Sequence, residues 1–296
     1  MIICIIIVIV ILMVIIYWYT SSDIIVLDSY RSRNLYNKRL KYFEKQMSHW
    51  YPLGSDKFRI DHGINYSAFF ERIGSPHMVV AGSNHIYGTG CGILRRISQY
   101  GIGRCWYICD LKIRADHRGN WLPFKMLSQC FHLKSLASKG YGISMNTPDT
   151  PNKIARLCKR IKLIEFKNAG NLLIYSLDYD AIRRIIDVIN RHKGATFFVS
   201  LTGIKDIILQ STSKPLKLLH MNFVKNIGDT MLDTVAEIFH EPQPGYTHMF
   251  CLHEHDVLVK YLHDIGVNTD TSATVIQHGL DKLKPDHYDF IQTSEI

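Results

Sequence analysis

The chain has 296 residues, of which 47% are hydrophobic and 21% charged, and its formal net charge is +9. This composition excludes an intrinsically disordered protein, and the length is enough for one large domain or two small ones. The seven cysteines include no CxxC pair, which favours free thiols in a reducing compartment. The basic residues form no combined aromatic and basic motif, so we expect lipid contact and no nucleic-acid binding.

Residues 1–20 are predicted to form a transmembrane anchor. The first 19 residues contain no charged side chain and no Gly or Pro. At about 1.5 Å per residue such a run crosses about 30 Å of hydrocarbon. A cleaved signal peptide is disfavoured because a basic n-region and a small-residue cleavage site are missing. Aromatic residues at 17–19 and basic residues between 31 and 45 place the following chain in the cytosol. The sequence therefore predicts a single-pass membrane protein that contacts membrane lipid.

Residues 21–55 predict a basic juxtamembrane helix and linker, in which Tyr36, Leu40 and Phe43 share one helical stripe. In residues 56–180 strands are expected at 58–61, 77–82, 91–98, 104–114, 141–145 and 171–179, with helices at 66–73, 121–138 and 150–161. In residues 181–296 strands are expected at 196–200, 216–223, 248–255, 272–279 and 288–295, with helices near 179–192, 230–239 and 256–265. The shared element order predicts a mixed α/β sheet in two related halves.

The stretch "DLKIRADHRGNWLPFKML" runs from a strand pattern through a charged turn into a helix pattern. Backbone N–H groups at a helix N-terminus bind phosphate, helped by the helix dipole. The stretch resembles the acyl-CoA motif of the GNAT-type acyltransferases, and "HMVVAG", "CGILRRI" and "NKIARLCKRIKL" resemble other segments of that family in order. The resemblance implies a mixed, mostly antiparallel sheet flanked by helices. It also implies that acetyl-CoA or a longer acyl-CoA is bound by Leu111, Lys112, Ile113, Arg118, Gly119, Asn120, Trp121 and Leu122.

The chain departs from the family at several positions. Trp121 and Pro123 stand where the family has two glycines, and N-myristoyltransferases, which consist of two fused GNAT-like halves, lack those glycines too. Cys158 or Lys159 takes the place of the tyrosine that protonates the leaving CoA thiolate. Asn146 follows the strand whose end receives the acyl group, although such a turn can need Asn for its own geometry.

The resemblance also implies a candidate base at the end of the chain. In N-myristoyltransferases the terminal carboxylate deprotonates the acceptor, which makes Ile296, or the side chain of Glu295, a candidate base. Asp61 and His62 either face the acceptor groove or cap the following helix. The candidate catalytic residues are thus Asn146, Cys158 and Ile296.

These observations predict an acyl-CoA-dependent N-acyltransferase that transfers an acyl group, with acetyl the expected one, to an amine of a small molecule or a protein. The alternative is a catalytically inactive GNAT-fold module that binds a partner, which Trp121, Pro123 and the missing tyrosine favour. Cys251, His253 and His255 alternate along one strand but lack standard zinc spacing, so no metal is expected.

Overall fold

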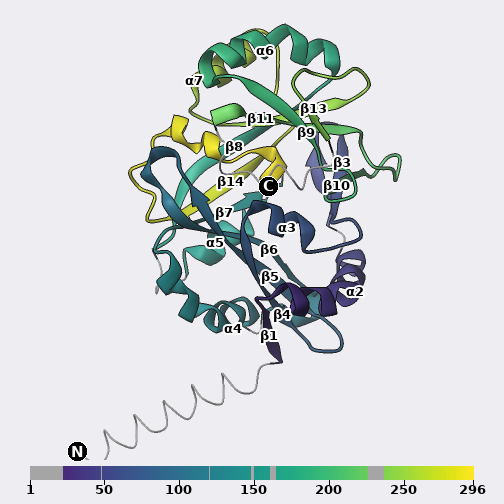
Figure 1. The fold of residues 1–296 in the computed structure, drawn as a ribbon, viewed down its shortest axis with the longest axis vertical. Coiled ribbons are helices and arrows are strands. Elements are labelled where there is room, and N and C mark those ends of the chain that lie inside the picture. Colours follow the sequence, from purple (N-terminus) through teal and green to yellow (C-terminus); the bar gives the residue numbers. More distant parts are fainter. Residues whose placement is uncertain (1–22, 48, 120, 148–149, 161–164, 226–236) are drawn as a thin grey trace, which may run out of the picture.

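The computed structural model describes residues 23–47, 49–119, 121–147, 150–160, 165–225 and 237–296 (Figure 1). Within these residues a large sheet contains β1 (Ile24–Leu27), β4 (Ser75–Ala81), β5 (Gly88–Ile97), β6 (Gly103–Ile113), β7 (Gly140–Met145), β8 (Lys167–Leu177), β9 (Thr196–Ser200), β11 (Leu218–Phe223), β12 (Glu237–Phe239), β13 (Thr247–His253) and β14 (Thr271–His278). A small sheet contains β2 (Tyr51–Leu53), β3 (Asp56–Asp61) and β10 (Asp206–Leu209).

The strand order of the large sheet is β1-β4-β5-β6-β7-β14-β8-β13-β11-β9-β12, and apart from the edge strand β1 its strand directions are symmetric about the central β14–β8 pair. On one side of the central β14–β8 pair, β7 is antiparallel to β14 and parallel to β6. On the other side, β13 is antiparallel to β8 and parallel to β11. The first half of the sequence therefore contributes β8, which lies next to the parallel pair β13–β11 of the second half. The second half contributes β14, which lies next to the parallel pair β7–β6 of the first half. The boundary predicted at residue 180 falls in the first turn of the helix α6 (Tyr179–Lys193), which follows β8, and the large sheet contains strands from both sides of it.

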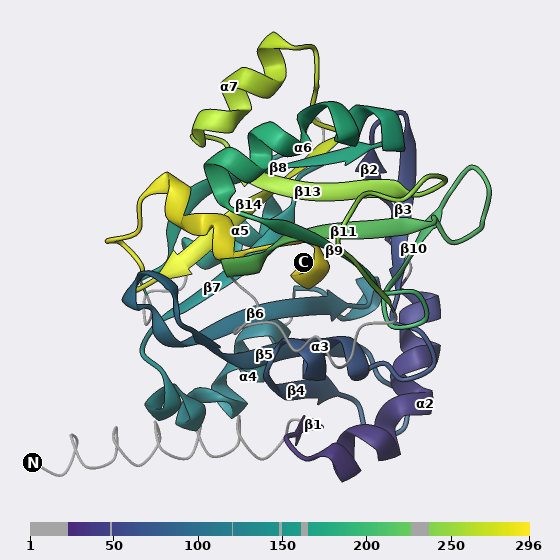
Figure 2. The ribbon, with the colours of Figure 1, turned by 45° about the horizontal axis from the view of Figure 1, so that its top comes forward.

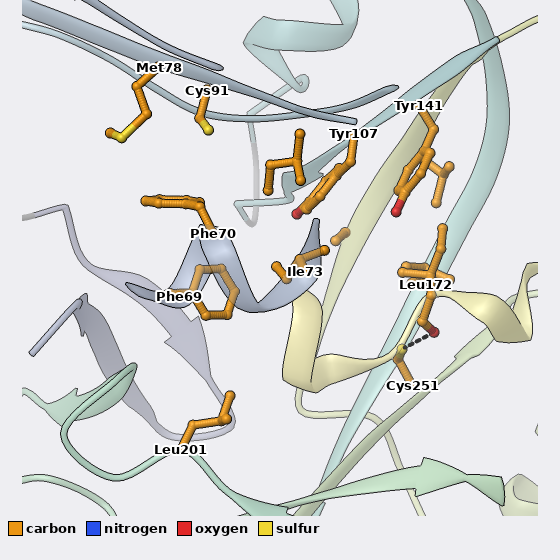
Figure 3. Close-up of a cluster of buried hydrophobic side chains, with 14 of the residues drawn as sticks. Phe69, Phe70, Ile73, Met78, Cys91, Tyr107, Tyr141, Leu172, Leu201 and Cys251 are labelled. Atoms are coloured by element: carbon orange, nitrogen blue, oxygen red, sulfur yellow. Dashed lines mark hydrogen bonds between the residues drawn. The ribbon is translucent and has the colours of Figure 1, made fainter. Parts of the chain in front are cut away.

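Helices cover both faces of the first half. The helix α2 (Tyr30–Gln46) begins at Ser29, whose side chain forms a capping box with Ser32. With α3 (Ala68–Ile73) it packs on the face to which Met78 and Val80 of β4 point, as Figure 3 shows for Phe69, Phe70 and Met78. The helix α4 (Leu122–Gln129) packs on the opposite face, where Leu122 and Met126 contact Val79 and Ala81.

The second half has its own hydrophobic cluster. The helices α6 (Tyr179–Lys193) and α7 (Val257–Asp264) lie against β8 and β13 (Figure 2). The isoleucines of α6 face inward at positions 182, 185 and 189, a spacing that places them on one helical face. They pack with Tyr175 and Phe250, whose rings are stacked with centroids 4.9 Å apart.

The predicted membrane topology is corrected by the structure. Within the described residues no helix is long and apolar enough to cross a bilayer, so the transmembrane helix, the single-pass localisation and the lipid contact are not supported. Residues 1–20, on which that prediction rested, lie outside the described residues. The fold also begins earlier than the predicted linker allowed, because β1 pairs with β4 and α2 buries Tyr36, Leu40 and Phe43 in the core.

Several predicted elements differ in extent or kind. The helix expected at 121–138 ends at Gln129 and is followed by a 3₁₀ segment at Phe131–Leu136. The helix expected at 150–161 is α5 (Lys153–Cys158), whose N-cap is Asn152. Of the helix expected at 230–239, residues 230–236 lie outside the described residues and 237–239 form β12. The strand expected at 288–295 is instead two 3₁₀ segments, Pro285–Phe290 and Thr293–Glu295.

The second 3₁₀ segment fills the space beside the parallel pair of the second half. The Thr293 hydroxyl donates to the Met249 carbonyl of β13 at 3.0 Å. The Ser294 hydroxyl donates to the side-chain oxygen of Asn222, on β11, at 2.7 Å. The C-terminal residues thus bridge β11 and β13, whereas the equivalent space beside β6 and β7 is open.

Candidate functional site

A cleft opens where the parallel strands β6 and β7 separate, a region that can be followed in Figure 1. The two strands pair only from Trp106 and Gly140 to Ile108 and Gly142. Beyond this point β6 continues with β5, and β7 continues with β14. Because hydrogen-bonded strands lie about 4.8 Å apart, the loss of pairing leaves a wedge between them. The cleft has a volume of about 1750 Å³, and residues 109–113 and 143–145 line its two sides.

A β-bulge interrupts β6 inside this cleft. Thr89 pairs with Lys112 and Cys91 with Cys109, so that Asp110 and Leu111 oppose the single residue Gly90. Asp110 has a left-handed backbone with φ of 56°, which costs a non-glycine residue about 1 kcal/mol. Its carboxylate accepts a hydrogen bond from the Tyr66 hydroxyl at 2.5 Å and pairs with the Lys112 ammonium at 2.6 Å. Side-chain contacts therefore hold the bulge, and a bulge leaves a backbone group unpaired at the cleft wall.

The turn before α4 carries the cationic end of the cleft. The Arg118 guanidinium donates to the Ile113 carbonyl at 3.0 Å, and Arg114 pairs with Asp116 at 2.6 Å. Trp121, the N-cap of α4, has φ of 56° and is 64% exposed, with no side-chain cap. The cationic residues lining the cleft are Arg59, Arg114, Arg118, Lys112, Lys134, Lys139 and Lys153. Their charge, together with the N-terminus of α4, favours a ligand that carries phosphates.

A buried charged pair lies in the wall formed by α2 and the end of β3. Glu44 accepts from Nδ1 of His62 and from Lys41 Nζ at 2.5 Å, and both Glu44 and His62 line the cleft. Burial by itself raises the pKa of Glu44, but hydrogen bonds from His62 and Lys41 bring it down to about 2. Burial lowers the pKa of His62, against the opposing effect of Glu44. At neutral pH the pair is therefore a carboxylate and a neutral imidazole.

The predicted cofactor residues fall into three groups. Leu111, Lys112, Ile113 and Arg118 line the cleft, with Lys112 already paired to Asp110. Gly119 and Trp121 lie exposed in the turn beside it, whereas Leu122, the first residue of α4, is buried against β4. Asn120 lies outside the described residues.

The structure places the predicted catalytic residues in different environments. Cys158 lines the cleft, and burial raises the pKa of its thiol, so the thiol stays protonated at neutral pH. Ile296 also lines the cleft, and its main-chain oxygen accepts from Lys205. Glu295 instead forms a buried ion pair with Arg95 at 2.9 Å.

Asn146 is held in a network that joins β7, β14 and β8. Its Nδ2 donates to Asn171 at 3.2 Å and to Ser272 at 3.0 Å. Its Oδ1 accepts from Asn152 at 2.9 Å and from Thr274 at 2.8 Å. Both donors and the acceptor are engaged, so Asn146 positions the strand end rather than presenting a free group to a substrate.

Sequence reasoning missed Glu44 and the bulge at Asp110. Glu44 belongs to the predicted basic juxtamembrane helix, yet it lies four residues after Leu40 and next to Phe43, within the apolar stripe. A carboxylate inside such a stripe is a signal of a buried, paired charge. No local signal marks the bulge, because Asp110 stands in an ordinary strand pattern. The sequence left two interpretations of His62, a place in the acceptor groove or a helix cap, and in the structure His62 lines the cleft.

No protein-family model and no curated protein sequence matches the chain. Similar solved structures include NAA60 of Arabidopsis thaliana in complex with a bisubstrate analogue, at 16% identity over 51% of this chain and 87% of that chain, with a TM-score of 0.36. A protein of Pyrococcus horikoshii assigned to the acetyltransferases matches at 8% identity over 91% and 93%, with a TM-score of 0.45. Naa50 of Arabidopsis thaliana, in complex with the bisubstrate analogue CoA-Ac-MVNAL, matches at 15% identity over 50% and 86%, with a TM-score of 0.32.

These structures are acetyltransferases, as the resemblance to the GNAT type predicted. All three TM-scores lie below 0.5 and all three identities below 25%, so the likeness is a coarse one of fold.

Proposed function

We propose that the protein is an acyl-CoA-dependent N-acyltransferase that uses the cleft between β6 and β7. The observation that carries the proposal is the combination of a strand separation, a bulge in its wall and a cationic turn at one end. In this proposal residues 118–122 hold the pyrophosphate, and the extended arm of the coenzyme runs between the diverging strands. The acyl group, acetyl in the simplest case, then reaches the bulge at Asp110.

The chemistry follows from this placement. An amine attacks the carbonyl carbon of the thioester, and the carbonyl oxygen gains negative charge as the tetrahedral intermediate forms. A backbone N–H freed by the bulge, between Cys109 and Ile113, donates to that oxygen, which is the kind of fixed donor that stabilises such a charge. Protonated Cys158 lines the same cleft and is a candidate donor for the departing thiolate, as an alternative to the protonated base. The two halves are proposed as related units, of which only the first keeps an open cleft.

Isothermal titration of the full chain with acetyl-CoA tests the proposal. Arg118→Glu places a carboxylate beside the proposed pyrophosphate site. A lost charge-assisted hydrogen bond is worth roughly 1.5–3 kcal/mol, so affinity should fall at least about tenfold. The matched control is Arg184→Glu, an exposed arginine on α6 outside the cleft, which should bind normally.

Equal affinity in the wild type and a well-folded Arg118→Glu protein would remove the turn from the site. Binding without thiol release in the presence of any amine would favour the second candidate function, an inactive binding module. The replacement of the two motif glycines by Trp121 and Pro123 is the observation that favours that alternative.

A further inference from the structure

We propose that Glu44 and His62 form the general-base pair of this acyl transfer, with His62 taking a proton from the acceptor amine. The inference rests on the proposed function and adds to it the residues that move the proton. Both side chains line the same cleft as the bulge, although they come from α2 and from the end of β3. Neither belongs to the turn that would hold the coenzyme.

Hydrogen bonding determines which nitrogen of His62 is free. An ionised carboxylate only accepts hydrogen bonds, so Nδ1, which contacts Glu44, must carry the proton of the neutral ring. Nε2 then keeps its lone pair. Among the described residues Nε2 has no hydrogen-bond partner, and the surrounding atoms do not cover it completely. His62 is buried but is one of the residues that line the cleft, and the proposal directs this lone pair toward the space where an acceptor would bind.

The pair is held rigidly and close to the bulge. The main-chain N–H of His62 donates to both Glu44 oxygens, at 3.3 and 3.4 Å. The His62 ring stacks on Phe70 with centroids 5.0 Å apart and lies 4.8 Å from the ring of Tyr66. The Tyr66 hydroxyl in turn donates to Asp110, so one side chain separates the imidazole from the bulge.

The charged and titratable groups around His62 come from each neighbouring element. They are Glu44 and Lys41 from α2, Asp61 and Arg59 from β3, Tyr66 before α3, and Asp110 and Lys112 from β6. Lys41 pairs with both Glu44 and Asp61, and Lys112 pairs with Asp110. Each carboxylate among them is therefore already paired with a cation or with His62, which leaves the imidazole as the group in this set that can take a proton from an amine.

The proton transfers balance without another reactant. The amine nitrogen forms a bond to the thioester carbon, the carbonyl electron pair moves to oxygen, and Nε2 takes the N–H proton. The intermediate collapses by breaking the C–S bond, and the imidazolium returns its proton to the CoA thiolate. The products are an amide and free coenzyme A. Glu44 stabilises the imidazolium that exists between the two transfers and acts as a positioning residue.

Thiol release from acetyl-CoA, with methoxyamine as the acceptor and the rate without enzyme subtracted, tests the pair. Methoxyamine is a weaker base than hydroxylamine and stays unprotonated above about pH 5, so a fall in kcat/KM on the acid side between about pH 5 and 9 reports the enzyme. We expect that fall below pH 6.5 in the wild type, because burial lowers the pKa of His62 from that value. A general base contributes roughly 10²–10⁴-fold, so His62→Gln and Glu44→Gln should lose at least about 100-fold and lose the acid limb. His248→Gln, a buried histidine of β13 outside the cleft, is the matched control.

The same variants are titrated with acetyl-CoA, which separates the two proposals. If acetyl-CoA binds and His62→Gln keeps a rate within about threefold of the wild type, the pair is not the base, although the cleft still holds the coenzyme. If acetyl-CoA binds but the wild type releases no thiol, the pair is overturned as well. Failure to bind acetyl-CoA overturns the proposed function itself. Substitutions of buried residues can unfold the protein, so nitrogen-15 spectra of the wild-type histidines give a second test. These spectra report which ring nitrogen carries the proton, and a proton on Nε2 of neutral His62 contradicts the assignment.

Discussion

Replacing Glu44 by glutamine should destabilise the protein at neutral pH and much less in acid. The folded pKa of Glu44 is about 2, compared with the ordinary value of 4.5. A difference of about 2.5 units corresponds to about 3 kcal/mol at 1.36 kcal/mol per unit. Because the folded pKa is depressed, this stability is fully present above pH 4.5 and is lost as the pH falls towards 2. Glutamine keeps the shape of the side chain but cannot ionise.

Urea unfolding of the wild type and Glu44→Gln, followed by circular dichroism at pH 7, 5, 4 and 3, measures the effect. We expect a gap of about 3 kcal/mol in the free energy of unfolding at pH 7 that shrinks steadily below pH 4.5. All other carboxylates are shared by the two proteins, so the difference reports Glu44 together with its hydrogen-bonded partner His62. Glu241→Gln, at an exposed site, should show no gap at any pH. A gap that is the same at pH 7 and pH 3 would refute the electrostatic account of the buried pair.

Three further changes test the packing that supports the site. Arg95→Met removes the guanidinium that pairs with the buried Glu295 carboxylate at 2.9 Å, so urea unfolding should show a loss of roughly 3–5 kcal/mol; a loss below about 1 kcal/mol would contradict a stabilising pair. Gly170→Ala should destabilise far more than Gly245→Ala, because an added Cβ would lie 2.5 Å from His253 Nε2 at the first position and in open space at the second; both have positive φ, so equal midpoints would disprove the steric reason. Asp178→Ala removes the side chain that accepts from the Ala181 N–H at 2.8 Å and should cost about 1 kcal/mol, measurable as a lower thermal midpoint, with Asp180→Ala as the control in the same turn.

Local patterns in the sequence carried most of the element assignments around the cleft. Alternation predicted β6 and β7 to within a residue at each end, and the turn at 118–122 was expected before its helix. These features depend on side-chain periodicity and turn chemistry within a few residues, which a single sequence displays. The element order also indicated a repeat, and the strands next to the central β14–β8 pair follow the same pattern of directions on both sides.

Long-range pairing decided what the local patterns could not. The alternating stretch 288–295 forms 3₁₀ turns because Thr293 and Ser294 find partners on β13 and β11, far away in the sequence. Asp110 adopts its left-handed backbone because Tyr66 and Lys112 hold its carboxylate. Glu44 meets His62 only after α2 has packed beside β3. The sequence by itself determined β6, β7 and the charged turn that follows β6. The tertiary structure decided which strands separate and which charges are buried together, because the energy of a buried charge depends on partners that only the folded chain brings within hydrogen-bond distance.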